Sequence, residues 1–135
     1  HVWVGTAYFA QGLPYSVVNN LPELLAAQAG ASLDAIGLTS LFHLPWNLKF
    51  LWAPAVDRIE TKRRWVLAMQ VALVLIFAAT ALLAGLSQMG AVAVCFLIAA
   101  VVAATQDIAI DGYYLTALAP RAQAQLVSHR AMAYK

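Results

Sequence analysis

Apolar residues fill four long stretches of this 135-residue chain, and short polar connections separate them. The apolar stretches cover residues 2–27, 33–56, 65–86 and 91–118. Each exceeds the roughly 20 residues that a helix needs to cross the hydrocarbon core of a bilayer. Backbone groups in lipid must be bonded within their own segment, and the period-two alternation of membrane-barrel strands is absent. The pattern therefore predicts four transmembrane helices.

Residues 122–135 continue a helical pattern without a breaker and mix polar with apolar side chains. This segment fits the start of a fifth span, which we favour, or an amphipathic helix lying on the membrane surface. The chain begins at His1 instead of a methionine and ends inside this pattern. We therefore expect residues 1–135 to form a single partial domain, the N-terminal part of a longer protein.

The composition supports an all-α integral membrane protein. Apolar residues make up 63% of the chain, charged residues only 10%, and the mean hydropathy is +0.75. Soluble domains carry about 25% charged residues. The net charge of +2 arises from basic residues near the ends of the spans, with no basic face interleaved with aromatic residues. A nucleic-acid partner is therefore not expected.

The basic residues are distributed unevenly and predict the orientation of the chain. The connection after the second stretch contains four basic residues: Arg58, Lys62, Arg63 and Arg64. Three more follow the fourth stretch: Arg121, Arg130 and Lys135. The other two connections contain none. Basic residues accumulate in cytoplasmic loops. We therefore expect a multi-pass protein whose N-terminus is cytoplasmic.

Polar residues recur on one face of two of the predicted helices. The first stretch has Tyr8, Gln11, Tyr15 and Asn19 at steps of three and four, and the fourth has Asp107, Asp111 and Tyr114. Such a stripe predicts a helix face turned toward a polar cavity. An ionised carboxylate near the middle of a membrane costs roughly 2.5 to 3.5 kcal/mol and usually serves a function. The third stretch has only Gln70 and Thr80 inside it, which predicts a lipid-facing helix.

Lys49 is the one basic residue inside a span and is the obvious countercharge for an aspartate. Lys49 and Asp111 each lie seven residues before the inner end of their stretch, which places both about 10 Å inside the membrane boundary. The sequence therefore predicts a pair between them. The pair could be permanent and merely neutralise two charges, or an aspartate could exchange its partner for a proton or a solute group. We favour the second interpretation, because a fixed pair leaves one aspartate without a partner.

Three motifs resemble the AmpG-like permeases of the major facilitator superfamily. They match the first, second and fourth helices of that family, in order: YFAQGLPY at 8–15, LPWNLKFLWAPAVDR at 44–58 and ATQDIAID at 104–111. The resemblance implies a fold of twelve helices in two halves, built from inverted three-helix repeats around a midplane site. This chain would supply the first four helices and the start of a fifth.

The resemblance also implies a function, namely proton-coupled uptake of a cell-wall muropeptide across the bacterial inner membrane. Eukaryotic relatives carry acetyl-CoA, so a related anion is the alternative cargo. By match to the motifs, Asp107 and Asp111 are candidates for proton coupling, and Gln11, Tyr15 and Gln106 for polar groups of the cavity. The expected partners are the bilayer, the remaining helices of the transporter, a small solute and protons, with no cofactor.

The sequence departs from the family at two places. The loop that contains Asp57, Arg58, Arg63 and Arg64 resembles the superfamily's cytoplasmic gating motif but has Ala53 in place of its first glycine; it could equally serve to orient the chain. Tyr113 and Tyr114 stand where many relatives carry a basic residue, so an anion-binding contact of the family is missing here.

Two other classes of protein are less well supported by the residues. A membrane-embedded, metal-dependent transferase would need more acidic ligands than the two aspartates, since Mg²⁺ takes about six oxygen ligands. A receptor built on a transporter fold would bind its ligand without moving it across the membrane. Neither class has a motif in this chain.

Overall fold

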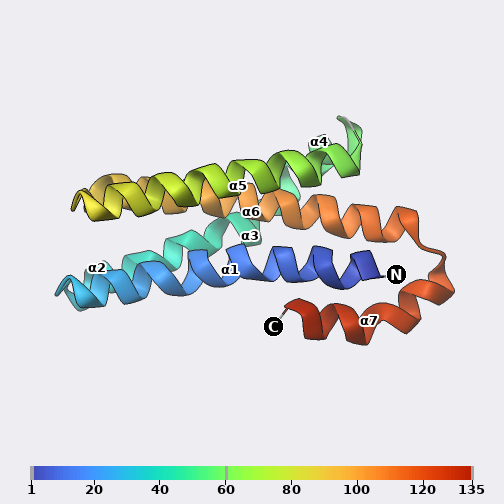
Figure 1. The fold of residues 1–135 in the computed structure, drawn as a ribbon, viewed down its shortest axis with the longest axis horizontal. Helices are drawn as coiled ribbons and strands as arrows, with labels where there is room; N and C mark the ends of the chain where they lie inside the picture. Colours follow the sequence, from blue (N-terminus) through green and yellow to red (C-terminus); the bar gives the residue numbers. More distant parts are fainter. Residues whose placement is uncertain (1, 60, 135) are drawn as a thin grey trace.

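The computed structural model describes residues 2–59 and 61–134, and it describes no side chains at 128–131, 133 and 134. Two of the predicted orienting charges therefore lie outside what the structure describes, namely the side chain of Arg130 and the whole of Lys135. Every regular element in the described part of the chain is helical. The long helices are α1 (Val2–Gln28), α5 (Lys62–Gly85) and α6 (Met89–Ala117), and a shorter α7 covers Pro120–Tyr134. Figure 1 shows α1 and α5 running in the same direction and α6, which contacts both, running in the opposite direction. Helix α7 returns beside α1.

The segment after α1 is not the single helix over 33–56 that the sequence predicts. It consists of short α-helical and 3₁₀ pieces in the order α2 (Leu33–Leu38), η1 (Thr39–His43), α3 (Leu44–Leu48), η2 (Lys49–Leu51) and α4 (Ala53–Arg58). Pro45 and Pro54 lie in the first turns of α3 and α4. Proline has no backbone N–H and clashes with the preceding turn, so the chain starts a new helical piece at each of them.

Among the described residues, α5 and α6 are the helices that are long and apolar enough to span a membrane. Helix α1 is long enough at 27 residues, but its polar side chains and two internal prolines make it less apolar than the other two. At the end of α1, Gly30 adopts a φ of 71°, and the N–H of Ala31 bonds to the carbonyl of Ala26 at 3.0 Å. This glycine-terminated cap reverses the chain toward α2.

Helix α6 lies at the centre of the bundle and contributes to all three buried apolar clusters. One cluster joins it to α1 and α5 through Val18, Leu73 and Phe96. Its alanines at 99, 100, 103, 104 and 109 are all buried, and small residues let neighbouring helices approach closely. Helix α5, in contrast, leaves large apolar side chains such as Val74 exposed, in agreement with the predicted lipid-facing helix.

Candidate functional site

A polar network occupies the C-terminal half of α6, where both aspartates lie. Asp107 forms an ion pair with Lys49 of η2. The Asp107 side chain is 8% exposed and the Lys49 side chain 34% exposed. The pair therefore joins the broken second segment to the central helix, with its carboxylate in the interior and its ammonium group partly accessible.

The predicted pairing of Lys49 with Asp111 is wrong, because the partner is Asp107, one helical turn away. The predicted depth assumed a regular α-helix that ends at residue 56. In the structure the segment continues to Arg58, and residues Lys49–Leu51 form a 3₁₀ helix. A 3₁₀ helix rises about 2.0 Å per residue instead of 1.5 Å. Lys49 is thus about 15 Å from the end of α4, and Asp107 is about 15 Å from the end of α6.

Asp111 has a different partner on α1. The Tyr8 hydroxyl donates a hydrogen bond to Asp111 Oδ1 at 2.7 Å, and Tyr8 is only 1% exposed. The Tyr8 ring meets the Tyr114 ring edge to face, with centroids 5.9 Å apart. The Tyr114 hydroxyl in turn donates to the backbone carbonyl of Gln123 at 2.6 Å. These contacts connect Asp111 with α1 and with the corner between α6 and α7.

Two members of the network were not predicted. Trp52 Nε1 donates to Thr105 Oγ1 at 3.1 Å, one turn from the Lys49 pair. Thr105 also donates to the carbonyl of Val101 at 2.8 Å. The available signal was the position of Thr105 directly before Gln106 and Asp107, since a hydroxyl inside an apolar helix either bonds its own backbone or reaches a neighbouring helix.

The predicted cavity residues fall into two groups. Tyr15 and Asn19 are half-buried; the Tyr15 ring lies edge-on to Trp46 at 5.1 Å, and Asn19 donates to the carbonyl of Tyr15. Gln11 and Gln106 are deeply buried, at 5% and 1% exposure. Among the described residues, four buried side-chain atoms have no hydrogen-bond partner: Gln11 Oε1, Asn19 Oδ1 and both amide atoms of Gln106.

The position of Gln11 follows from the antiparallel register of α1 and α6. Tyr8 bonds to Asp111, and Val18 packs in the same cluster as Ala100. Gln11 lies between these two contacts, at the level of Asp107. An unpartnered buried amide costs about 1–3 kcal/mol, so a polar group retained beside a charged pair marks this level of the bundle as a candidate functional site.

The predicted gating loop forms a different set of contacts at the start of α5. Asp57 pairs with Lys62, whose ammonium group also donates to the carbonyl of Val56 at 3.1 Å. The Lys62 side chain passes over Gly112 of α6, where an added Cβ would lie 2.9 Å from Lys62 Cε. Arg58 and Arg63 are exposed. The sequence predicted Lys62 only as one of the orienting charges, whereas in the structure its side chain also approaches α6 at Gly112.

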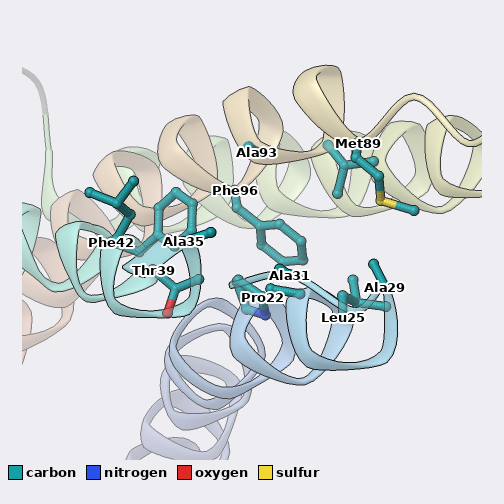
Figure 2. Close-up of a pocket in the computed structure, with 13 residues that line it drawn as sticks. Pro22, Leu25, Ala29, Ala31, Ala35, Thr39, Phe42, Met89, Ala93 and Phe96 are labelled. Carbon is teal, nitrogen blue, oxygen red and sulfur yellow. The ribbon is translucent and has the colours of Figure 1, made fainter. Parts of the chain in front are cut away.

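A cavity of about 350 Å³ lies toward the other end of the bundle, between α1, α2, η1 and α6. Figure 2 shows its lining, which includes Pro22, Phe42 and Phe96 and is almost entirely apolar. Neither aspartate lines it. In the described part of the chain, no group of three or more His, Cys, Asp or Glu residues could hold a metal ion. The polar network on α6 is therefore the better candidate site.

Comparisons with known proteins identify a family for this chain. The family described as "Acetyl-coenzyme A transporter 1" matches residues 3–131. An uncharacterized protein of Haemophilus influenzae is 37% identical over 110 residues, covering 78% of this chain and 26% of the relative. The anhydromuropeptide permease of Escherichia coli K12 is 31% identical over 110 residues, covering 78% of this chain and 22% of the permease.

A more distant relative is an uncharacterized membrane protein of Saccharomyces cerevisiae, 34% identical over 70 residues, or 47% of this chain and 12% of the relative. No solved structure matches the chain significantly. The chain spans about a quarter of the length of its bacterial relatives. Because the family match covers nearly the whole sequence, this chain belongs to the acetyl-CoA transporter and AmpG-like permease family, a family of membrane transporters and not of enzymes.

Proposed function

We propose that the full-length protein is a proton-coupled secondary transporter that takes up a cell-wall muropeptide or a related solute across the bacterial inner membrane. In this proposal the chain supplies the first helices of a twelve-helix major facilitator fold, with its N-terminus in the cytoplasm. The solute class is that of the Escherichia coli permease, which is 31% identical to this chain. The basic connection around Arg58 and Lys62 supports the orientation.

The observation that carries the proposal is the Lys49–Asp107 pair. Its carboxylate is 8% exposed, and a buried carboxylate is costly to maintain unless a partner charge compensates it. A proton that neutralises Asp107 releases Lys49, and the freed ammonium group can then bind an anionic group of the solute. Asp107 and Lys49 thus provide a means of linking proton binding to solute binding at one place.

Other polar groups of α1 and α6 lie near this pair. Asp111 accepts a hydrogen bond from Tyr8 of α1, and Gln11 lies at the level of Asp107 with an unpartnered amide oxygen. We assign Gln11, Tyr15 and Asn19 to the lining of the solute cavity, because they follow one face of α1. We also assign Gln106 of α6 to this lining, since it is buried next to Asp107 in the sequence.

A second cargo, an acetyl-CoA-like anion, is favoured by the family description. Lys49 provides a cation for such a solute as well, since a lysine ammonium group also binds phosphate. The two cargoes make different demands, because a nucleotide-like anion needs several positive charges. Among the described residues, Lys49 is the basic side chain that joins the polar network on α6.

The test is uptake by the full-length protein in proteoliposomes with the substitution Asp107→Asn. This change removes the titratable group and keeps most of the side-chain shape, so it should abolish accumulation driven by a proton gradient while leaving membrane insertion intact. Asp34→Asn is a matched control, because Asp34 is exposed in the first turn of α2. Gradient-driven uptake by Asp107→Asn equal to that of the control would reject the coupling role.

A further inference from the structure

A second cavity, of about 390 Å³, opens between α1, α5 and α6. Its lining includes Arg63, Gln70, Trp3, Tyr113 and Ile110. This volume is within the range of about 300–1,000 Å³ that ligand pockets occupy. We propose that this crevice binds an anionic phospholipid, with the headgroup phosphate on Arg63 and the start of an acyl chain against the apolar wall below it.

The charge of the crevice favours an anion. Arg63 is exposed, and among the described residues no acidic side chain lines the crevice. The neighbouring Lys62 is already paired with Asp57, so it does not compete for a ligand on Arg63. The guanidinium group presents several N–H donors in a planar fork that matches phosphate oxygens.

The mouth of the crevice lies where a membrane surface would be. Arg63 is the second residue of α5, which is long and apolar enough to span a bilayer. Figure 1 places the start of α1, the start of α5 and the end of α6 at the same end of the bundle. Trp3 and Tyr113 meet edge to face with ring centroids 5.0 Å apart, and aromatic residues of this kind concentrate at headgroup level.

Beyond Arg63 the lining is mostly apolar, with Thr6 and Gln70 as its polar members. Val66 and Leu67 follow on α5, facing Ala7 and Ala10 of α1 across the crevice. Leu67 is 53% exposed, so this wall continues into the outer surface of α5. Basic pockets between transmembrane helices are known to bind anionic lipid headgroups. A phosphate at Arg63 with a chain directed past Leu67 satisfies both the charged mouth and the apolar wall.

The experiment uses the full-length protein in nanodiscs made with equal amounts of phosphatidylglycerol and phosphatidylcholine. The lipids that remain bound after partial delipidation are measured by native mass spectrometry. We expect the unmodified protein to retain phosphatidylglycerol preferentially, and Arg63→Gln to lower that preference about five-fold, the effect of one basic residue near an anionic surface. Arg121→Gln is the matched control, because it removes the same charge from an exposed position on α7.

Leu67→Trp tests the crevice separately from the charge. The exposed position tolerates a larger side chain, which should fill the crevice and lower the retention of phosphatidylglycerol while Arg63 remains. The proposal is overturned if Arg63→Gln and Arg121→Gln lower retention equally, which would show a general surface charge. It is also overturned if Leu67→Trp leaves the retention of phosphatidylglycerol unchanged. A third contrary result is an unmodified protein that retains both lipids equally, as expected if another helix of the full-length chain fills the crevice.

Discussion

Removing the two members of the Lys49–Asp107 pair should have unequal effects on stability. Lys49→Met keeps the apolar stem but removes the positive charge that pairs with the Asp107 carboxylate, which is 8% exposed. Breaking a fully buried pair in this way costs about 3–5 kcal/mol. Because Lys49 is itself 34% exposed, part of that interaction is screened, and we expect a loss of about 2 kcal/mol in the free energy of unfolding.

Asp107→Asn should cost less, about 1 kcal/mol, because the remaining ammonium group can turn toward water or lipid headgroups. The double variant removes both charges of this pair, so its loss should be smaller than the sum of the two single losses. We expect a coupling free energy of about 1 kcal/mol, which exceeds the 0.3–0.5 kcal/mol scatter of independent sites.

The assay is equilibrium unfolding of the full-length protein in mixed micelles, with all four members of the double-mutant cycle. A second cycle with Lys49→Met and Asp111→Asn serves as the comparison, since Asp111 accepts its hydrogen bond from Tyr8. Additive losses in the first cycle, or a larger coupling in the second, would refute the assignment of Asp107 as the partner of Lys49.

Two further predictions concern the neighbours of this pair. Tyr8→Phe removes the hydroxyl that donates to Asp111 at 2.7 Å. A hydrogen bond to a charged group contributes about 1.5–3 kcal/mol, so the free energy of unfolding should fall by about that amount. An unchanged free energy of unfolding would mean that water replaces the hydroxyl without cost. Gln106→Leu removes two buried amide atoms that have no described partner, so it should raise the free energy of unfolding by about 1–2 kcal/mol. A lower free energy of unfolding in Gln106→Leu would show that the rest of the transporter supplies a partner for Gln106. If the variant is more stable but no longer takes up solute, the amide is retained for transport.

The apolar pattern predicted much of the helical architecture, because the length of an apolar stretch and its flanking charges are properties of the sequence itself. It placed long helices over 65–86 and 91–118, and the structure has α5 over Lys62–Gly85 and α6 over Met89–Ala117. The prolines at 45 and 54 could have predicted the interruptions of the second segment. The amount of 3₁₀ helix between them depends on packing against α6, which no single segment encodes.

The candidate site was predicted in its residues but not in its pairing. The cost of a carboxylate in an apolar helix identified Asp107 and Asp111, and the same reasoning identified Lys49. Asp107 and Asp111 lie one turn apart on α6, so the partner of Lys49 depends on the position of Lys49 along α6. The 3₁₀ helix at Lys49–Leu51 sets that position. The Tyr8–Asp111 contact joins residues 103 positions apart, and no local pattern indicates which helices meet.

The most direct test of the transport proposal is the uptake of radiolabelled anhydromuropeptide into proteoliposomes that contain the full-length protein, with and without an imposed proton gradient. Unlabelled acetyl-CoA is added as a competitor in a parallel series. The proposal predicts accumulation that requires the gradient and is insensitive to acetyl-CoA. Equal uptake with and without the gradient, or none from correctly folded protein, would contradict proton-coupled muropeptide uptake.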